Sequence, residues 1–160
     1  MARANKVRKS LQSSYIEGSL AQIMMGLRDT FIMPLALALG AVTSQVGLLT
    51  SIPSLMASLV QIKSADITEW LGSRKRAFSV SMLIHTLVFF PIILIPFLLN
   101  RWRIEALIFF YVLHTVFGAL AGPPWASLMA EYIPPAKRGK FFGFRNKVLG
   151  FIYVISAFFG

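Results

Sequence analysis

Four stretches of mostly apolar residues, each about as long as a bilayer-spanning helix, dominate the sequence. A hydrocarbon core about 30 Å thick requires roughly 20 apolar residues in helical conformation. We expect spans at Ile16–Leu39, Val46–Ile62, Ala77–Leu99 and Ile104–Met129. The pattern predicts an all-α protein, a polytopic membrane helical bundle whose first partner is the lipid bilayer.

A fifth apolar stretch begins near Val148 and runs to Gly160, the last residue of the chain. Residues 148–160 are too few to cross a bilayer as a helix. No basic anchor follows them. We therefore expect four complete spans and a truncated fifth, as in a fragment of a longer protein.

The composition excludes most other classes of protein. The chain is 56% apolar and only 14% charged, whereas soluble domains are roughly 25% charged. Its mean hydropathy of +0.69 also argues against intrinsic disorder. The sequence contains no cysteine, which excludes disulfide frameworks, thiolate metal sites and cysteine nucleophiles.

The basic residues are distributed unevenly between the two ends of the expected spans. The net charge is +10, and short cytoplasmic loops are typically enriched in Lys and Arg. The outer loops contain only Arg101 and Arg103. We therefore expect a multi-pass protein of the cell membrane, such as a bacterial inner membrane, with a cytoplasmic N-terminus. No nucleic-acid partner is required. The basic residues assigned to the cytoplasmic side are Arg3, Lys6, Arg8, Lys9, Lys63, Arg74, Lys75, Arg76, Lys137, Arg138, Lys140, Arg145 and Lys147.

Arg28 and Asp29 lie in the middle of the first expected span. A charge at that depth costs several kcal/mol unless it faces protein or water. Neighbouring side chains on a helix point about 100° apart, so we expect the two charges not to neutralise each other fully. They either line a substrate or ion path or form a structural pair with polar groups such as Gln22.

His85 and His114 lie in the third and fourth expected spans. Counted from the cytoplasmic ends, their depths differ by roughly 10 Å, which predicts that they do not pair directly. Two histidines without further ligands make a poor metal site, and a hydrogen bond across helices is the alternative for His85.

The segment from Gly118 to Gly122 has a small residue at both ends, a spacing that favours close helix packing. Pro123 and Pro124 follow directly, and we expect them to break or kink the fourth span.

No catalytic, metal-binding or nucleotide-binding motif is present in the sequence. We therefore expect no enzyme, no catalytic residue, no metal and no cofactor.

The connection between the second and third spans resembles a signature of the major facilitator superfamily, G-x-x-x-D-[RK]-x-G-[RK]-[RK]. Gly72, Arg74 and Lys75 carry the resemblance, and Glu69 replaces the aspartate. Ala65 and Trp70 stand for the first glycine and the first basic residue. The resemblance implies that Glu69, Gly72, Arg74 and Lys75 form a cytoplasmic gate latch, while Gly72 also allows a tight turn.

A second, degenerate match lies in the fourth span. His114, Gly118 and Ala121 follow the family pattern R-x-x-x-G-x-x-A, with histidine in place of the arginine that is linked with proton coupling. Pro124–Asn146 is also similar to the end of span four and the following loop in many bacterial members.

The resemblance implies part of the N-terminal six-helix half of a secondary transporter that moves a small-molecule substrate by alternating access. Its C-terminal half would then be the missing partner. On this hypothesis Arg28, Asp29 and His114 line the substrate or ion path. The alternative is a small membrane-embedded interaction or assembly subunit without transport activity.

Overall fold

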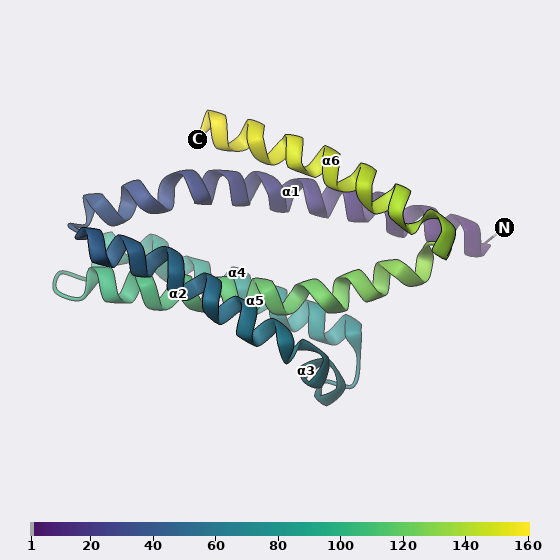
Figure 1. Ribbon diagram of the computed structural model, residues 1–160, viewed down its shortest axis with the longest axis horizontal. Coiled ribbons are helices and arrows are strands. Elements are labelled where there is room, and N and C mark those ends of the chain that lie inside the picture. Colours follow the sequence, from purple (N-terminus) through teal and green to yellow (C-terminus); the bar gives the residue numbers. More distant parts are fainter. Residues whose placement is uncertain (1) are drawn as a thin grey trace. The chain divides into compact units, whose positions relative to one another are not determined.

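The computed structural model describes the backbone of residues 2–160 and the side chains from Leu11 onward. This part of the chain is helical and contains no strand, as the sequence predicts (Figure 1). The side chains of Arg3, Lys6, Arg8 and Lys9, which contribute to the predicted orientation, lie outside the described ones. The helices are α1 (Ala2–Ala38), α2 (Thr43–Ile62), α3 (Ser64–Trp70), α4 (Arg74–Leu98), α5 (Arg103–Tyr132) and α6 (Pro135–Phe159).

Five of these helices are long and apolar enough to cross a membrane; in α1 the segment that qualifies is Leu11–Ala38. Large apolar side chains are exposed along all five, and Phe97 and Phe158 are more than 80% exposed. A water-soluble protein rarely exposes so much apolar surface. The arrangement is compatible with helices surrounded by lipid.

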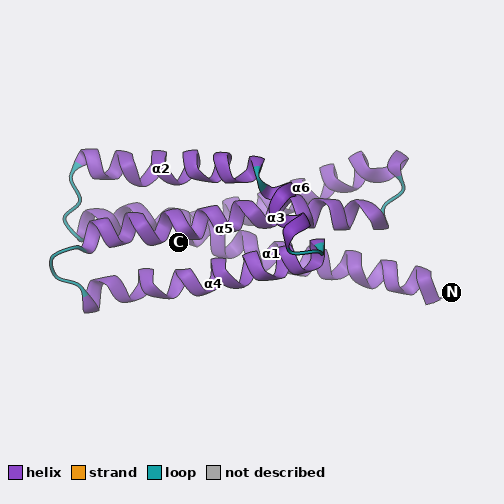
Figure 2. Ribbon diagram, turned by 90° about the horizontal axis from the view of Figure 1, so that it is seen from below, coloured by secondary structure: helices purple, strands orange, loops and turns teal. Residues whose placement is uncertain are grey.

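The chain forms two compact units, and each is described by itself. The first contains residues 1–34 and 129–160. In it α1 and α6 run side by side in the same direction (Figure 1). The second contains residues 35–128, with α2, α3, α4 and most of α5 (Figure 2). Within it α4 and α5 form an antiparallel hairpin joined by residues 99–102.

The last helix differs from the expectation. It begins at Pro135, not near Val148, and its 25 residues make it long enough to cross a membrane. Proline is favourable in the first helical turn, since its missing N–H would have no helical partner there. Basic residues such as Arg145 and Lys147 interrupt the apolar pattern, and hydropathy alone therefore places the start of this helix too late. The sequence predicted that these two residues lie in a loop, but they lie in α6.

Two further features concern the connection after the second span and the prolines of the fourth. The connection after the second span contains a seven-residue helix, α3, which hydropathy alone does not predict. Of the break or kink expected at Pro123 and Pro124, the break is absent, because α5 is continuous from Arg103 to Tyr132, and the kink stays a prediction. Membrane helices tolerate proline where neighbouring helices and side chains satisfy the freed backbone groups.

Candidate functional site

A furrow lined by both polar and apolar side chains lies between α1 and α6 in the first unit. It is open to the surroundings and has a volume of about 450 Å³. We call it the α1–α6 furrow. It is lined by Gln22, Met25, Asp29, Arg145, Asn146, Leu149, Gly150 and Tyr153.

Asp29 is the acidic residue of this furrow, and both of its carboxylate oxygens are hydrogen-bonded. Nε and Nη2 of Arg28 lie 2.8 and 2.6 Å from Oδ1, and the Tyr153 hydroxyl donates to Oδ2 at 3.1 Å. Arg28 and Asp29 therefore form a direct ion pair, while the expectation that they do not neutralise each other fully stays a prediction. The long arginine side chain reaches across the 100° that separate neighbouring positions on a helix. The exposed side-chain fractions are 11% for Arg28 and 33% for Asp29.

Arg145 is the basic residue of the furrow, and the sequence did not single it out. It is only 8% exposed. Its Nε donates to Ser14 Oγ and its Nη2 to the Ser14 carbonyl, each at 3.1 Å. These bonds fix the plane of the guanidinium against α1. The available signal was an arginine four residues before Leu149 on one helical face, which the assignment to a loop concealed.

Small residues on α1 allow the close approach of α6. A Cβ on Gly18 would collide with Arg145. A Cβ on Gly26 would lie 2.8 Å from Ser156 Cβ. One turn further along, the Thr30 hydroxyl lies 3.1 Å from the Ala157 carbonyl and 3.0 Å from the Gly26 carbonyl. The positions follow a four-residue spacing, which places them on one face of α1.

In the second unit, His85 and His114 stack directly on each other. Their ring centroids are 3.7 Å apart and their planes differ by 21°. His85 Nδ1 lies 2.7 Å from the His114 carbonyl oxygen, and His114 Nδ1 lies 2.9 Å from the His85 carbonyl oxygen. A carbonyl only accepts, so both Nδ1 atoms must carry a proton. A neutral ring in this pair therefore has its lone pair on Nε2.

The predicted 10 Å difference in depth between these histidines is wrong. His85 lies 13 residues before the end of α4 at Leu98, and His114 lies 11 residues after the start of α5 at Arg103. Measured from the loop that joins the two helices, the depths differ by about 3 Å. The expectation failed because it assumed that the cytoplasmic ends of the two helices lie at the same level, whereas α5 has 30 residues and α4 has only 25. The cross-helix hydrogen bond weighed for His85 is confirmed.

The residues expected to pack or kink the fourth span have different surroundings. Gly118 lies against the His85 ring, whose nearest atoms would be 3.0 Å from a Cβ. At Gly122 a Cβ would meet only Gln61 Nε2 of α2, at 3.9 Å. Only the first of these glycines is needed for a close approach. Pro123 is partly buried within the continuous α5.

The four residues predicted to form a latch surround one cavity at the junction of α3 and α4, which we call the α3–α4 cavity. Its volume is about 490 Å³, and it is lined by Thr68, Glu69, Gly72, Ser73, Arg74, Lys75 and Leu128. Gly72 has φ = +68°, which confirms the expected turn. Arg74 donates to Ser127 Oγ at 2.8 Å. Ser73 separates Gly72 from Arg74, so the basic pair begins one residue later than in the signature.

The predicted path residues are divided between the units. Arg28 and Asp29 belong to the first unit and His114 belongs to the second. Within the described residues, no three His, Asp or Glu side chains come together as a metal site would require.

Comparison with protein families, with curated proteins and with solved structures finds no match for this chain.

Proposed function

We propose that the chain spans a membrane and forms part of a secondary transporter in which the α1–α6 furrow lines the path of a small polar solute. The polar cluster of Arg28, Asp29 and Tyr153 supports this proposal. It lies on two helices that are otherwise apolar enough to cross a membrane. Charged groups at such positions face protein or water, since contact with lipid is costly. The transporter class itself comes from the resemblance of Gly72, Arg74 and Lys75 to the major facilitator superfamily signature.

In the proposed mechanism, the furrow opens alternately to the two sides of the membrane. Arg28 orients Asp29, and the Tyr153 hydroxyl holds its second oxygen. A solute that donates hydrogen bonds would compete with Tyr153 for that oxygen. Gln22 and Asn146 add amide donors and acceptors on the two walls. His114 is proposed as an ion-path residue, with Nε2 as its protonation site.

Cysteine accessibility tests whether water reaches the furrow. The chain has no cysteine, so a single introduced thiol gives a signal without background. Gly150 lines the furrow and has open space around it, whereas Phe151 is 69% exposed and lies outside the furrow lining. The two are adjacent in α6 and therefore lie at nearly the same depth. In intact membranes, Gly150→Cys should react with a membrane-impermeant thiol reagent and Phe151→Cys should not.

The result also separates the proposal from the assembly-subunit alternative. A furrow covered by another protein would leave Gly150→Cys unreactive in membranes and reactive after extraction into detergent. That outcome would favour the subunit and contradict an open solute path.

Solute binding is tested with the purified full chain. A panel of sugars, organic acids, amino acids and nucleosides is screened for a rise in the thermal unfolding midpoint, which binding to the folded state produces. A solute of the furrow should lose its effect in Gly150→Trp, which places a large side chain in the furrow. It should keep its effect in the matched control Phe151→Trp. Equal responses of the two variants would contradict binding in the furrow.

A further inference from the structure

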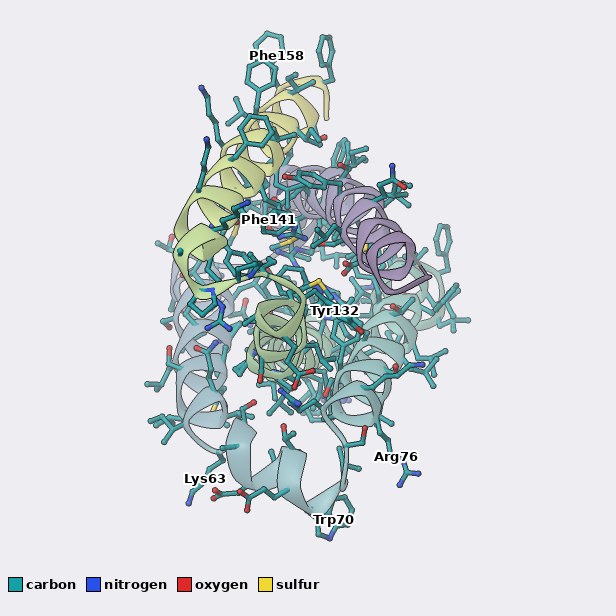
Figure 3. All side chains as sticks on the ribbon, turned by 90° about the vertical axis from the view of Figure 1, so that its right-hand side faces the viewer. Lys63, Trp70, Arg76, Tyr132, Phe141 and Phe158 are labelled. Atoms are coloured by element: carbon teal, nitrogen blue, oxygen red, sulfur yellow. The ribbon has the colours of Figure 1, made fainter. Side chains whose placement is uncertain are left out.

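The segment that joins α2 to α4 combines an exposed aromatic side chain with a run of basic residues. Trp70 is 85% exposed at the end of α3. Lys63 precedes α3, and Arg74, Lys75 and Arg76 begin α4. Figure 3 shows Lys63, Trp70 and Arg76 along the same lower edge of the view, extending away from the helices. All of these residues belong to the second unit.

The position of this segment follows from the helices on either side of it. Both α2 and α4 are long and apolar enough to cross a membrane. The short connection between two spans has to remain at one membrane surface. Tryptophan is enriched at the level of the lipid headgroups, and basic residues near the end of a span attract anionic lipids. Trp70 and the basic residues are therefore expected in the headgroup layer.

The charges of the segment favour an anion. Four basic residues stand against two acidic ones, Asp66 and Glu69. Asp66 is paired with Lys63, with Nζ 3.2 Å from Oδ2. Arg74 and Lys75 line the α3–α4 cavity, and the bond from Arg74 to Ser127 orients the guanidinium there.

We propose that the α3–α4 cavity binds the headgroup of an anionic phospholipid, with Trp70 beside it in the headgroup layer. The phosphate lies against Arg74 and Lys75, whose guanidinium and ammonium groups form charge-assisted hydrogen bonds with phosphate oxygens. Glu69 lines the same cavity and would repel a second negative charge, although it accepts hydrogen bonds from hydroxyl groups. The chemistry therefore selects a headgroup with one phosphate charge and free hydroxyls, as in phosphatidylglycerol.

The volume of about 490 Å³ is sufficient for such a headgroup. The Thr68 hydroxyl donates to the Ser64 carbonyl at 2.7 Å, and its oxygen is therefore oriented as an acceptor. The inference rests on the membrane part of the proposed function, but it does not depend on transport or on the furrow. A bound lipid would occupy the residues that the family resemblance assigns to a gate latch.

Native mass spectrometry of the full chain in detergent tests the proposal. The protein is titrated with phosphatidylglycerol and, separately, with zwitterionic phosphatidylcholine. The first phosphatidylglycerol should bind more tightly than the first phosphatidylcholine. Lys75→Gln, at an exposed position, should weaken the first phosphatidylglycerol about fivefold, the loss expected for one basic residue at a lipid surface. The matched control is Arg101→Gln in the 99–102 loop, which should leave this affinity unchanged.

Phosphatidic acid tests the role of Glu69, because its headgroup has no hydroxyl beyond the phosphate. It should bind the unmodified protein more weakly than phosphatidylglycerol does, and Glu69→Gln should reduce that difference. Equal binding of phosphatidylglycerol and phosphatidylcholine would overturn the proposal, as would equal losses in Lys75→Gln and Arg101→Gln. None of these outcomes depends on the reactivity of Gly150→Cys, so failure here is distinguishable from failure of the proposed function.

Discussion

Gly18 lies directly against the guanidinium of Arg145, and a Cβ at position 18 would overlap with the Nη2 atom and approach Leu149 Cδ1 to 2.9 Å. The arginine cannot move away without losing its two hydrogen bonds to Ser14. This contact fixes how closely α1 and α6 approach each other. It also holds one end of the α1–α6 furrow in place.

Gly18→Ala should therefore lower the free energy of unfolding by about 1–2 kcal/mol, the usual cost of an overpacked contact. The measurement is denaturant-induced unfolding in detergent micelles. Gly143→Ala in α6 is the matched control, since nothing lies within 4 Å of its Cβ position. The control should be neutral or slightly stabilising, because alanine favours the helix over glycine. A stable Gly18→Ala would show that α1 and α6 are less closely packed than described.

The stack of His85 and His114 should appear as an energetic coupling between the two side chains. Each single substitution by alanine removes one cross-helix hydrogen bond and the ring stacking. We expect each to cost about 2–4 kcal/mol, as for other large buried side chains. The double variant should cost less than the two single variants combined, by about 1–2 kcal/mol. Strict additivity in the unfolding measurements would contradict the stack.

Tyr153 and Asp29 should contribute unequally to stability. Tyr153→Phe removes one hydrogen bond and should cost about 1 kcal/mol. Asp29→Asn removes the carboxylate charge beside a guanidinium that is largely shielded from solvent. Its cost should lie between the values for exposed and buried ion pairs, about 1–3 kcal/mol. Denaturant titration of both variants gives the order, and a larger loss in Tyr153→Phe would contradict the described geometry.

The turn at Gly72 should depend on its backbone conformation. A φ of +68° is unfavourable for any residue with a Cβ, so Gly72→Ala should cost about 1–2 kcal/mol. Gly72→Asn should cost less, because asparagine tolerates this region better than alanine. Gly47→Ala in α2, where a Cβ has open space, is the control. Equal unfolding free energies for Gly72→Ala and Gly72→Asn would argue against the positive φ.

The long apolar stretches were sufficient to predict the all-helical fold, because hydropathy averaged over a span is insensitive to single residues. Helix ends were less predictable. The start of α6 at Pro135 was missed because Arg145 and Lys147 lower the local hydropathy. Whether such residues are paired within the protein depends on the neighbouring helix. The sequence of α6 contains no information about Ser14, the partner of Arg145.

Only the part of the candidate site that lies on α1 could be predicted from the sequence. Arg28 and Asp29 stand out as charges in an apolar segment, and the structure places Asp29 in the furrow. Tyr153 and Arg145 belong to the site through α6, which lies more than 100 residues later. The pairing of His85 with His114 was missed, although counting the residues from the 99–102 loop to each histidine predicts similar depths. The depth of two residues in a hairpin is reliable only when it is measured from the loop that joins the arms.

That hairpin also determines which changes of length α4 and α5 can accept. One residue inserted between His85 and Leu98 would rotate His85 by about 100° away from His114. An insertion of a full turn would restore its direction but displace the ring by about 5 Å along the axis. Residues added in the 99–102 loop would instead leave both arms unchanged, at a small cost in loop entropy. Tags or reporter sequences are therefore best placed in this loop, where the histidine stack is preserved.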